Sequence, residues 1–103
     1  DGSAVRDFVF VKDVVNACLL AAEQGGGVLN VARGEYITIL ELARLIKQLT
    51  GSSSKIVHAD PRPGDIHTSY ADISRIERLG FKPSPDQTEN LLQTIRFFQK
   101  RRV

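Results

Sequence analysis

The sequence predicts a small mixed α/β domain of short strands and about four helices. Short runs of β-prone residues alternate with segments that have helical spacing. Capping residues precede the helical segments, and glycine or proline stands between most of the expected strands and helices. Such alternation is typical of α/β proteins. The 103 residues suit one domain with a modest core.

Composition narrows the classes of partner that we expect. Hydrophobic residues make up 42% and charged residues 25% of the chain, as in a globular protein. A net charge of +2 predicts no nucleic-acid partner, and the absence of a long apolar run predicts no membrane partner. The single Cys18 and the lack of a signal peptide predict a reducing, cytoplasmic location. Because the chain contains no Met, we expect a piece of a longer protein.

Residues 1–24 are expected to form a strand and a helix. The β-prone residues 8–11 predict the strand, and Asp13 is expected to cap a helix that ends near Gln24. The helical spacing predicts one apolar face, which makes Cys18 an inert core residue. The members of that face are Val14, Val15, Cys18, Leu19 and Ala22.

The glycines at 25–27 end this helix. They precede a strand rather than a helix, which is the reverse of a phosphate-binding loop. Residues 28–31 predict a buried strand, in which Asn30 either caps a turn or reaches toward a ligand.

A second helix is expected over residues 39–50. Thr38 and Glu41 have the spacing of a capping box, and Gly51 stands where a helix commonly ends. The predicted buried stripe consists of Ile39, Leu42, Ala43, Leu45, Ile46 and Leu49.

The last third is expected to hold one strand and two helices. Residues 55–58 predict the strand. Asp72 is expected to cap a short helix over residues 73–79, after which Phe81 anchors the chain to the core. Asp86 and Glu89 again have capping-box spacing, before a helix that ends near Gln99. Its expected buried residues are Leu91, Leu92, Ile95 and Phe98.

The bend at residues 61–66 is the candidate functional segment. Its two prolines exclude a helix, and Gly64 allows a sharp change of direction. The Arg62 guanidinium suits phosphate, and Asp65 can accept hydrogen bonds from sugar hydroxyls. These six residues are thus suited to a sugar phosphate, and the alternative is an Arg–Asp pair that pins a surface turn.

Three groups of residues, taken in order, resemble the extended short-chain dehydrogenase/reductases. Residues 1–15 read Asp-Gly-x-x-x-Arg-Asp-Phe-Val-Phe-Val-Lys-Asp-Val-Val, and residues 29–31 read Leu-Asn-Val before a capped helix. The third group is Arg62-Pro63-Gly64-Asp65-Ile66, then Ala71-Asp72-x-Ser74 and Leu79-Gly80-Phe81-x-Pro83. Essentially the whole chain resembles the C-terminal third of NAD-dependent nucleotide-sugar epimerases and dehydratases, and most resembles the UDP-glucose 4-epimerases.

This resemblance implies a role for four residues. Arg6 and Arg62 match the two arginines that bind the nucleotide diphosphate, and Asp65 matches the acid that bonds the ribose. Phe8 stands at a substrate-site position where some relatives have Tyr. Two arginines can clamp a diphosphate with charge-assisted bonds worth roughly 1.5–3 kcal/mol each. The alternative for Arg6 is an ion pair with Asp7 or Asp13.

The resemblance also implies what the chain lacks. The sequence has neither Gly-x-x-Gly-x-x-Gly nor Tyr-x-x-x-Lys, so we expect no NAD site and no catalytic residue within it. In the parent, hydride would pass from the sugar C4 to NAD and return to the other face of the rotated keto sugar.

The resemblance places residues 1–103 as a substrate-binding domain without its Rossmann core. Residues 1–33 are expected to pack on that absent Rossmann domain, and the strand at 28–31 is expected to join its sheet. Ala32, directly after this strand, stands where relatives usually have Gly. We expect a homodimeric parent and self-association of this piece, because unpaired apolar strands attract partners.

Three functional alternatives and one minor site remain open. The chain is part of a UDP-hexose 4-epimerase, part of a related dehydratase, reductase or decarboxylase, or a stand-alone ligand-binding module. His58 and His67 flank the bend, but no set of companion ligands predicts a metal site.

Overall fold

The computed structural model describes residues 1–101. The elements are β1 (Val5–Arg6), α1 (Val11–Gln24), β2 (Ile37–Thr38), α2 (Ile39–Thr50), β3 (Thr68–Ser69), α3 (Ser74–Glu77) and α4 (Gln87–Lys100). The predicted class, with short strands and four helices, is therefore confirmed. None of the helices in this range has the length and apolarity that a membrane span requires.

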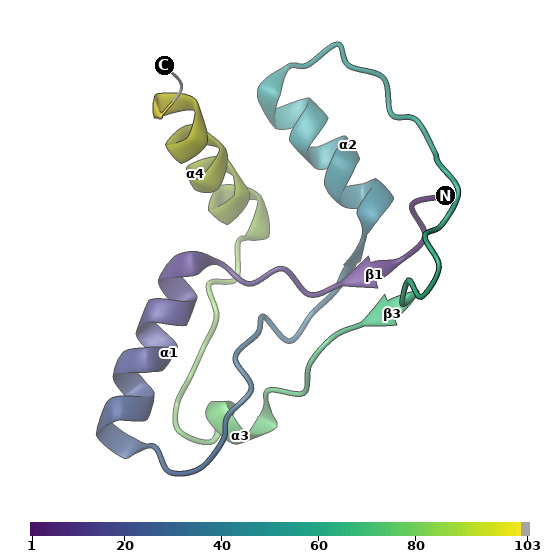
Figure 1. Cartoon of the computed structure of the whole chain (residues 1–103). Coiled ribbons are helices and arrows are strands. Elements are labelled where there is room, and N and C mark those ends of the chain that lie inside the picture. The colour runs from purple at the N-terminus through teal and green to yellow at the C-terminus, as the bar shows by residue number, and fades with distance from the viewer. Residues whose placement is uncertain (102–103) are drawn as a thin grey trace.

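The three strands form one small sheet in the order β2-β1-β3 (Figure 1). The central strand β1 runs antiparallel to β2 and parallel to β3. Figure 1 shows α2 and α4 on one side of β1, while α1 and α3 lie at the opposite end of the molecule from α2. The long segment between α2 and β3 returns along the outside of α2, which brings the bend next to the sheet.

Two tyrosines stack across the central strand. Arg6 pairs with Ile37 in β2 and with Ser69 in β3, so Tyr36 and Tyr70 flank the next residue of the chain. Their ring centroids lie 4.9 Å apart, with an angle of 22° between the ring planes. Stacking of this kind contributes about 0.5–1.5 kcal/mol. It therefore joins the two outer strands of the sheet.

The hydrophobic core is small and lies where α1, α3 and the segment before residue 33 meet. Ile76 is its largest fully buried side chain. The other buried members are Ala17, Ala32, Ile73 and Phe81. The prediction that Phe81 anchors the chain to the core is confirmed.

The predicted inner face of α1 is wrong. The residues that turn inward are Asp13, Ala17 and Leu20, whereas Val15 and Leu19 are 53% and 62% exposed. Cys18 is exposed too, so it is not a core residue. The core therefore meets the side of α1 that carries Ala17 and Leu20, and Val15 and Leu19 stay in contact with water.

The three predicted strands at 8–11, 28–31 and 55–58 do not form. Residues 8–10 and 28–31 contain no helix or strand, and Val11 already begins α1, with Phe10 rather than Asp13 at the N-cap. Val28 and Val57 are 82% and 83% exposed. Their β-prone sequences lack a neighbouring strand within the described residues, and a strand needs a partner to complete its hydrogen bonds.

The predicted caps of α2 and α4 are confirmed. The Glu41 N–H donates to Thr38 Oγ1 at 3.0 Å, and the Glu89 N–H donates to Asp86 Oδ1 at 3.0 Å. Gly51 ends α2 with φ of 65°, the left-handed conformation that glycine favours. The predicted burial is only partly met, because Ile39, Ile46 and Phe98 are exposed. The α2–α4 contact covers one narrow strip of each helix.

The N-cap of the short helix α3 is Ile73 rather than the predicted Asp72, and the helix covers residues 74–77 rather than 73–79. The Asp72 carboxylate, one residue earlier, accepts the N–H of Ser74 at 2.8 Å. This backbone hydrogen bond, with smaller effects of the Ser74 side chain and of Arg78 and Arg75, lowers the pKa of the exposed Asp72 carboxyl. The interaction therefore favours the charged carboxylate at the helix start.

The Asp7 carboxylate ties β1 to the turn at residues 33–34. Its Oδ1 accepts the N–H of Arg33 and its Oδ2 accepts the N–H of Gly34, both at 2.8 Å. Gly34 has φ of +85°, and a Cβ added there would lie 2.8 Å from the Ile73 Cδ1. The carboxylate thus fixes a turn that only glycine accommodates easily.

The Arg33 side chain extends this contact to the segment before α4. Its Nη1 donates to the Ser84 carbonyl at 2.8 Å, and its Nη2 donates to the Pro85 carbonyl at 3.1 Å. The Ser84 N–H donates to the buried Asp13 carboxylate at 3.0 Å, and the Ser84 hydroxyl donates to Asn90 Oδ1 at 3.0 Å. One polar network therefore links β1, α1, the turn at 33–34 and α4.

We expect Gly34→Ala to lower the free energy of unfolding by about 1–3 kcal/mol, because the new methyl group meets Ile73 in a left-handed backbone. Chemical denaturation measures this loss. Gly26→Ala is the matched control, since a Cβ at Gly26 meets nothing within 4 Å. Equal losses in the two variants would contradict the tight packing at Gly34.

Asp7→Ala should lower the free energy of unfolding by roughly 1.5–3 kcal/mol, the value of one charge-assisted hydrogen bond. We count one bond rather than two because the bond to Gly34 is exposed to water. Asp60→Ala serves as the control, because Asp60 is exposed. A loss at Asp7 no larger than that at Asp60 would show that the network contributes little.

Candidate binding site

Residues 62–65 form a tight turn that presents Arg62 and Asp65 to solvent. The Asp65 N–H donates to the Arg62 carbonyl at 3.1 Å, and Gly64 has φ of +85°. Pro63 followed by such a glycine is typical of a type II turn. The Asp65 Oδ2 also accepts the N–H of Arg62 at 2.9 Å. Asp65 therefore pins the turn through the Arg62 backbone.

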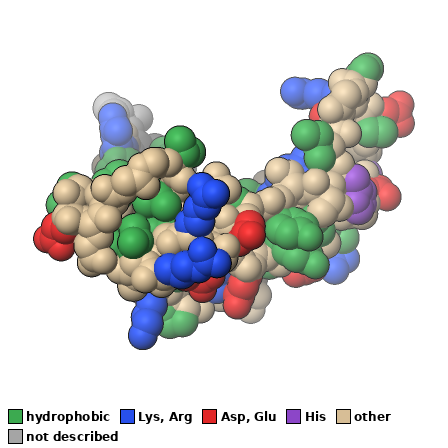
Figure 2. Space-filling model, turned by 90° about the horizontal axis from the view of Figure 1, so that it is seen from below, with side chains coloured by type: hydrophobic (Ala, Val, Ile, Leu, Met, Phe, Trp, Pro, Cys, Tyr) green, Lys and Arg blue, Asp and Glu red, His purple; other side chains and the backbone are tan. Residues whose placement is uncertain are grey.

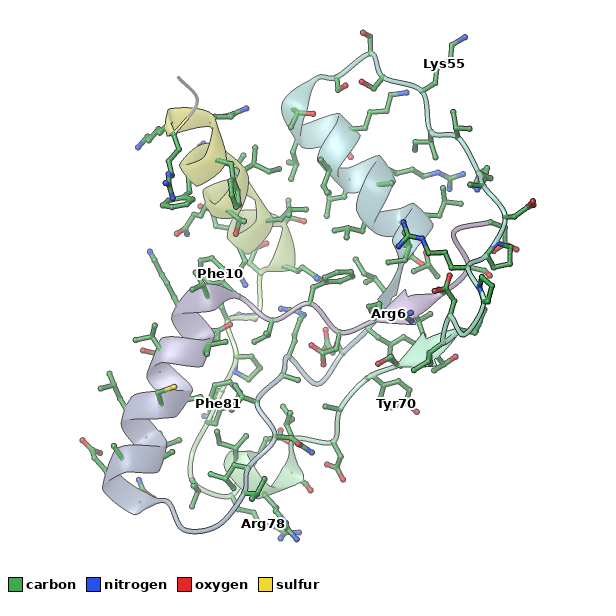
Figure 3. All side chains as sticks on the ribbon, in the orientation of Figure 1. Arg6, Phe10, Lys55, Tyr70, Arg78 and Phe81 are labelled. Carbon is green, nitrogen blue, oxygen red and sulfur yellow. The ribbon has the colours of Figure 1, made fainter. Side chains whose placement is uncertain are left out.

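Arg6 lies against the residues that follow this turn (Figure 3). Its Nη2 donates to the Ile66 carbonyl at 2.5 Å, and its Nη1 donates to the His67 carbonyl at 3.3 Å and to the Val5 carbonyl at 2.7 Å. The Val5 N–H donates to the same His67 carbonyl at 2.8 Å. The fold thus brings Arg6 next to the segment that carries Arg62 and Asp65.

The predicted alternative for Arg6, an ion pair with Asp7 or Asp13, is wrong. Among residues 1–101 the ion pair formed is between Arg33 and Glu35, at 3.2 Å. Asp7 and Asp13 instead accept backbone N–H groups. The Arg6 charge is therefore not neutralised by a carboxylate and can attract an anionic ligand.

The remaining site candidates lie at two other places. Phe8 is half-buried and lines a cavity of about 200 Å³ together with Leu42 and Leu91. The Asn30 amide donates to the Asp72 carbonyl at 3.4 Å. Both residues are thus placed by packing and hydrogen bonding on segments other than the bend.

The His67 ring lies beside the Arg6 contact, with its Nε2 3.1 Å from Ser3 Oγ and its Nδ1 3.1 Å from Thr68 Oγ1. Within residues 1–101 no group of three or more His, Cys, Asp or Glu is placed to hold a metal ion. The polar partners of His67 are therefore hydroxyl groups.

Sequence reasoning did not anticipate a second open cavity, of about 690 Å³, between the start of α1 and α4. It is lined by Val9, Phe10, Val11, Lys12, Gln93, Thr94, Arg96, Phe97, Phe98 and Lys100. Of its lining residues, Phe98 was predicted to be buried but is 67% exposed, and Phe10 was predicted to lie in a strand. Figure 2 shows that apolar side chains also reach the surface on the underside of the molecule, among basic and acidic ones.

Residues 1–32 match the model of the NAD dependent epimerase/dehydratase family. Similar proteins include UDP-glucose 4-epimerase of Mycolicibacterium smegmatis, with 36% identity over 98% of this chain and 33% of the relative. GDP-L-fucose synthase 1 of Arabidopsis thaliana has 30% identity over 96% of this chain and 31% of its own length. The dTDP-4-dehydro-6-deoxy-D-allose reductase of Streptomyces bikiniensis has 37% identity over 96% and 31%.

Solved structures agree with these matches. The UDP-glucose 4-epimerase of Thermotoga maritima with UDP-glucose has a TM-score of 0.90 and 39% identity, over 98% of this chain and 33% of that one. The UDP-N-acetylglucosamine 4-epimerase of Methanobrevibacter ruminantium with UDP-N-acetylmuramic acid has a TM-score of 0.91 and 39% identity, over 99% and 34%. The chain thus spans about a third of the length of these proteins.

The sequence and the fold agree along almost the whole chain, and the predicted resemblance is confirmed. Over about one third of their length, this chain is similar to the NAD-dependent epimerases of the extended short-chain dehydrogenase/reductase superfamily, and it is most like UDP-glucose 4-epimerase.

Proposed function

We propose that this chain is the nucleotide-sugar-binding part of a UDP-glucose 4-epimerase-like enzyme. Arg6, Arg62 and Asp65 bind the nucleotide: the two guanidinium groups clamp the diphosphate and Asp65 accepts a ribose hydroxyl. Phe8 contributes an apolar wall near the substrate. Binding energy gained at the nucleotide would position the hexose for chemistry at groups outside these 103 residues.

One observation carries the proposal. Arg6 lies in β1 and the Arg62–Asp65 turn lies far along the sequence, yet Arg6 donates to the carbonyls of Ile66 and His67, directly after that turn. A cation without a carboxylate partner and an exposed turn with a second cation thus share one edge of the molecule. Doubly charged diphosphate is a ligand of matching charge.

The parent enzyme would use NAD, but the residues of this chain do not fit an NAD site. Neither the glycine-rich fingerprint nor Tyr-x-x-x-Lys occurs in the sequence. We therefore assign the chain no cofactor-binding or catalytic residue and expect it to be inactive alone. The whole enzyme would interconvert UDP-glucose and UDP-galactose in the cytoplasm, as a homodimer.

A second reaction within the same superfamily also has support. Relatives of this chain include a GDP-L-fucose synthase and a dTDP-sugar reductase, at identities close to that of the UDP-glucose 4-epimerase. The alternative is therefore a reductase or dehydratase part that binds a nucleotide sugar with another base.

We further propose that residues 1–33 pack on a Rossmann domain of the parent. The outer stripe of α1 has apolar residues in contact with water, and Val28 after the helix is 82% exposed. The stripe consists of Val11, Val15, Cys18 and Leu19. Relatives are three times as long as this chain, so they have residues available to cover it.

Calorimetric titration with UDP and UDP-glucose tests the clamp. The double variant Arg6→Ala/Arg62→Ala should bind about a hundredfold or more weakly, since each charge-assisted bond contributes at least about 1.5 kcal/mol. Arg78→Ala is the control, an exposed arginine directly after α3, remote from Arg6 (Figure 3). Unchanged binding in the double variant would refute the clamp. Tighter binding of GDP or dTDP than of UDP would favour the alternative reaction.

Light scattering tests the exposed stripe of α1. The chain should self-associate, and Val15→Glu/Leu19→Glu should shift it toward the monomer because each glutamate places a charge on the apolar contact. Asn16→Glu adds the same charge at an exposed polar position of α1. A wild-type chain that is wholly monomeric would contradict the proposal.

A further inference from the structure

The Arg6 side chain makes contacts that a residue devoted to a ligand would not need. It donates to three backbone carbonyls, those of Val5, Ile66 and His67. Two of these belong to the segment between the Arg62–Asp65 turn and β3. Arg6 is thus bound to the part of the chain that carries the other nucleotide-binding candidates.

The atoms used by these bonds leave one defined edge of the guanidinium free. Nη1 donates to Val5 and His67, and Nη2 donates to Ile66, which accounts for three of the five N–H donors. The donors that remain are Nε–H and one N–H of Nη2, and in the planar group Nε–H runs parallel to the Nη2 N–H on its side. Two parallel donors of this kind match two oxygens of one oxyanion.

The backbone around this contact is otherwise weakly held. β3 consists of only two residues, Thr68 and Ser69, and both are exposed. Among residues 1–101, the hydrogen bonds of the turn before it run between Arg62 and Asp65, so they fix its shape but not its place on the sheet. The Val5 N–H to His67 carbonyl bond and the two Arg6 bonds connect residues 66–67 to β1.

We infer that Arg6 is a positioning residue for the Arg62–Asp65 turn as well as a ligand-binding residue. Its Nη1/Nη2 edge binds the backbone of residues 66–67 and so sets where the turn lies, while its Nε/Nη2 edge faces the oxyanion. The second role rests on the proposed function, whereas the first does not. A lysine keeps the charge at this position but cannot serve both edges at once.

Amide hydrogen exchange, measured without ligand, tests the positioning role. In Arg6→Lys, exchange over residues 62–69 should become about three- to tenfold faster, because local opening needs less free energy when the two carbonyl contacts are lost. Arg78→Lys, an equally conservative change directly after α3, should leave exchange in residues 62–69 unchanged. Unchanged exchange in Arg6→Lys would overturn the inference.

UDP titration of Arg6→Lys, Arg62→Ala and the double variant gives a second readout. If Arg6 places Arg62, the loss in the double variant should be clearly smaller than the sum of the two single losses. Additive losses in a chain that binds UDP would overturn the inference. Faster exchange in Arg6→Lys, combined with a wild-type chain that does not bind UDP, would support the positioning role and refute the nucleotide-binding proposal.

Discussion

The contact between the Asp7 carboxylate and the N–H groups of Arg33 and Gly34 is the constraint on which the rest of the structure depends. It holds the residue directly after β1 against the turn at residues 33–34, which precedes β2. The Arg33 guanidinium then holds Ser84 and Pro85, and Ser84 in turn bonds to Asp13 on α1. The described part of the chain has five buried apolar side chains, and this network joins elements that their core does not reach.

Local sequence signals were sufficient for the starts of α2 and α4 and for the end of α2, but not for the start of α1, where Phe10 rather than Asp13 is the N-cap. Thr38, Asp86 and Gly51 act within their own turns, so their roles can be predicted from a few adjacent residues. Strands differ because their hydrogen bonds need a distant partner. The β-prone residues at 28–31 lack one among the described residues, whereas residues 5–6, which the sequence does not mark as a strand, pair on both sides.

In the candidate site, too, features specified by adjacent residues could be predicted, and contacts between distant residues could not. The tight turn at 62–65 was predictable because proline, glycine and aspartate specify it locally. The backbone contacts of the Arg6 guanidinium could not be predicted, because their partners lie 60 and 61 residues away in the sequence. Nor does any local pattern reveal that Asp7 bonds residue 33, at a separation of 26 residues.

The stacked tyrosines give this chain a built-in optical signal. The sequence contains two tyrosines and no tryptophan, so its near-ultraviolet absorption above the phenylalanine bands comes from Tyr36 and Tyr70 alone. Because their rings meet across β1 at 4.9 Å, exciton coupling between them depends on β2 and β3 both being in place. Near-ultraviolet circular dichroism of the unlabelled chain therefore reports the integrity of the sheet that carries Arg6.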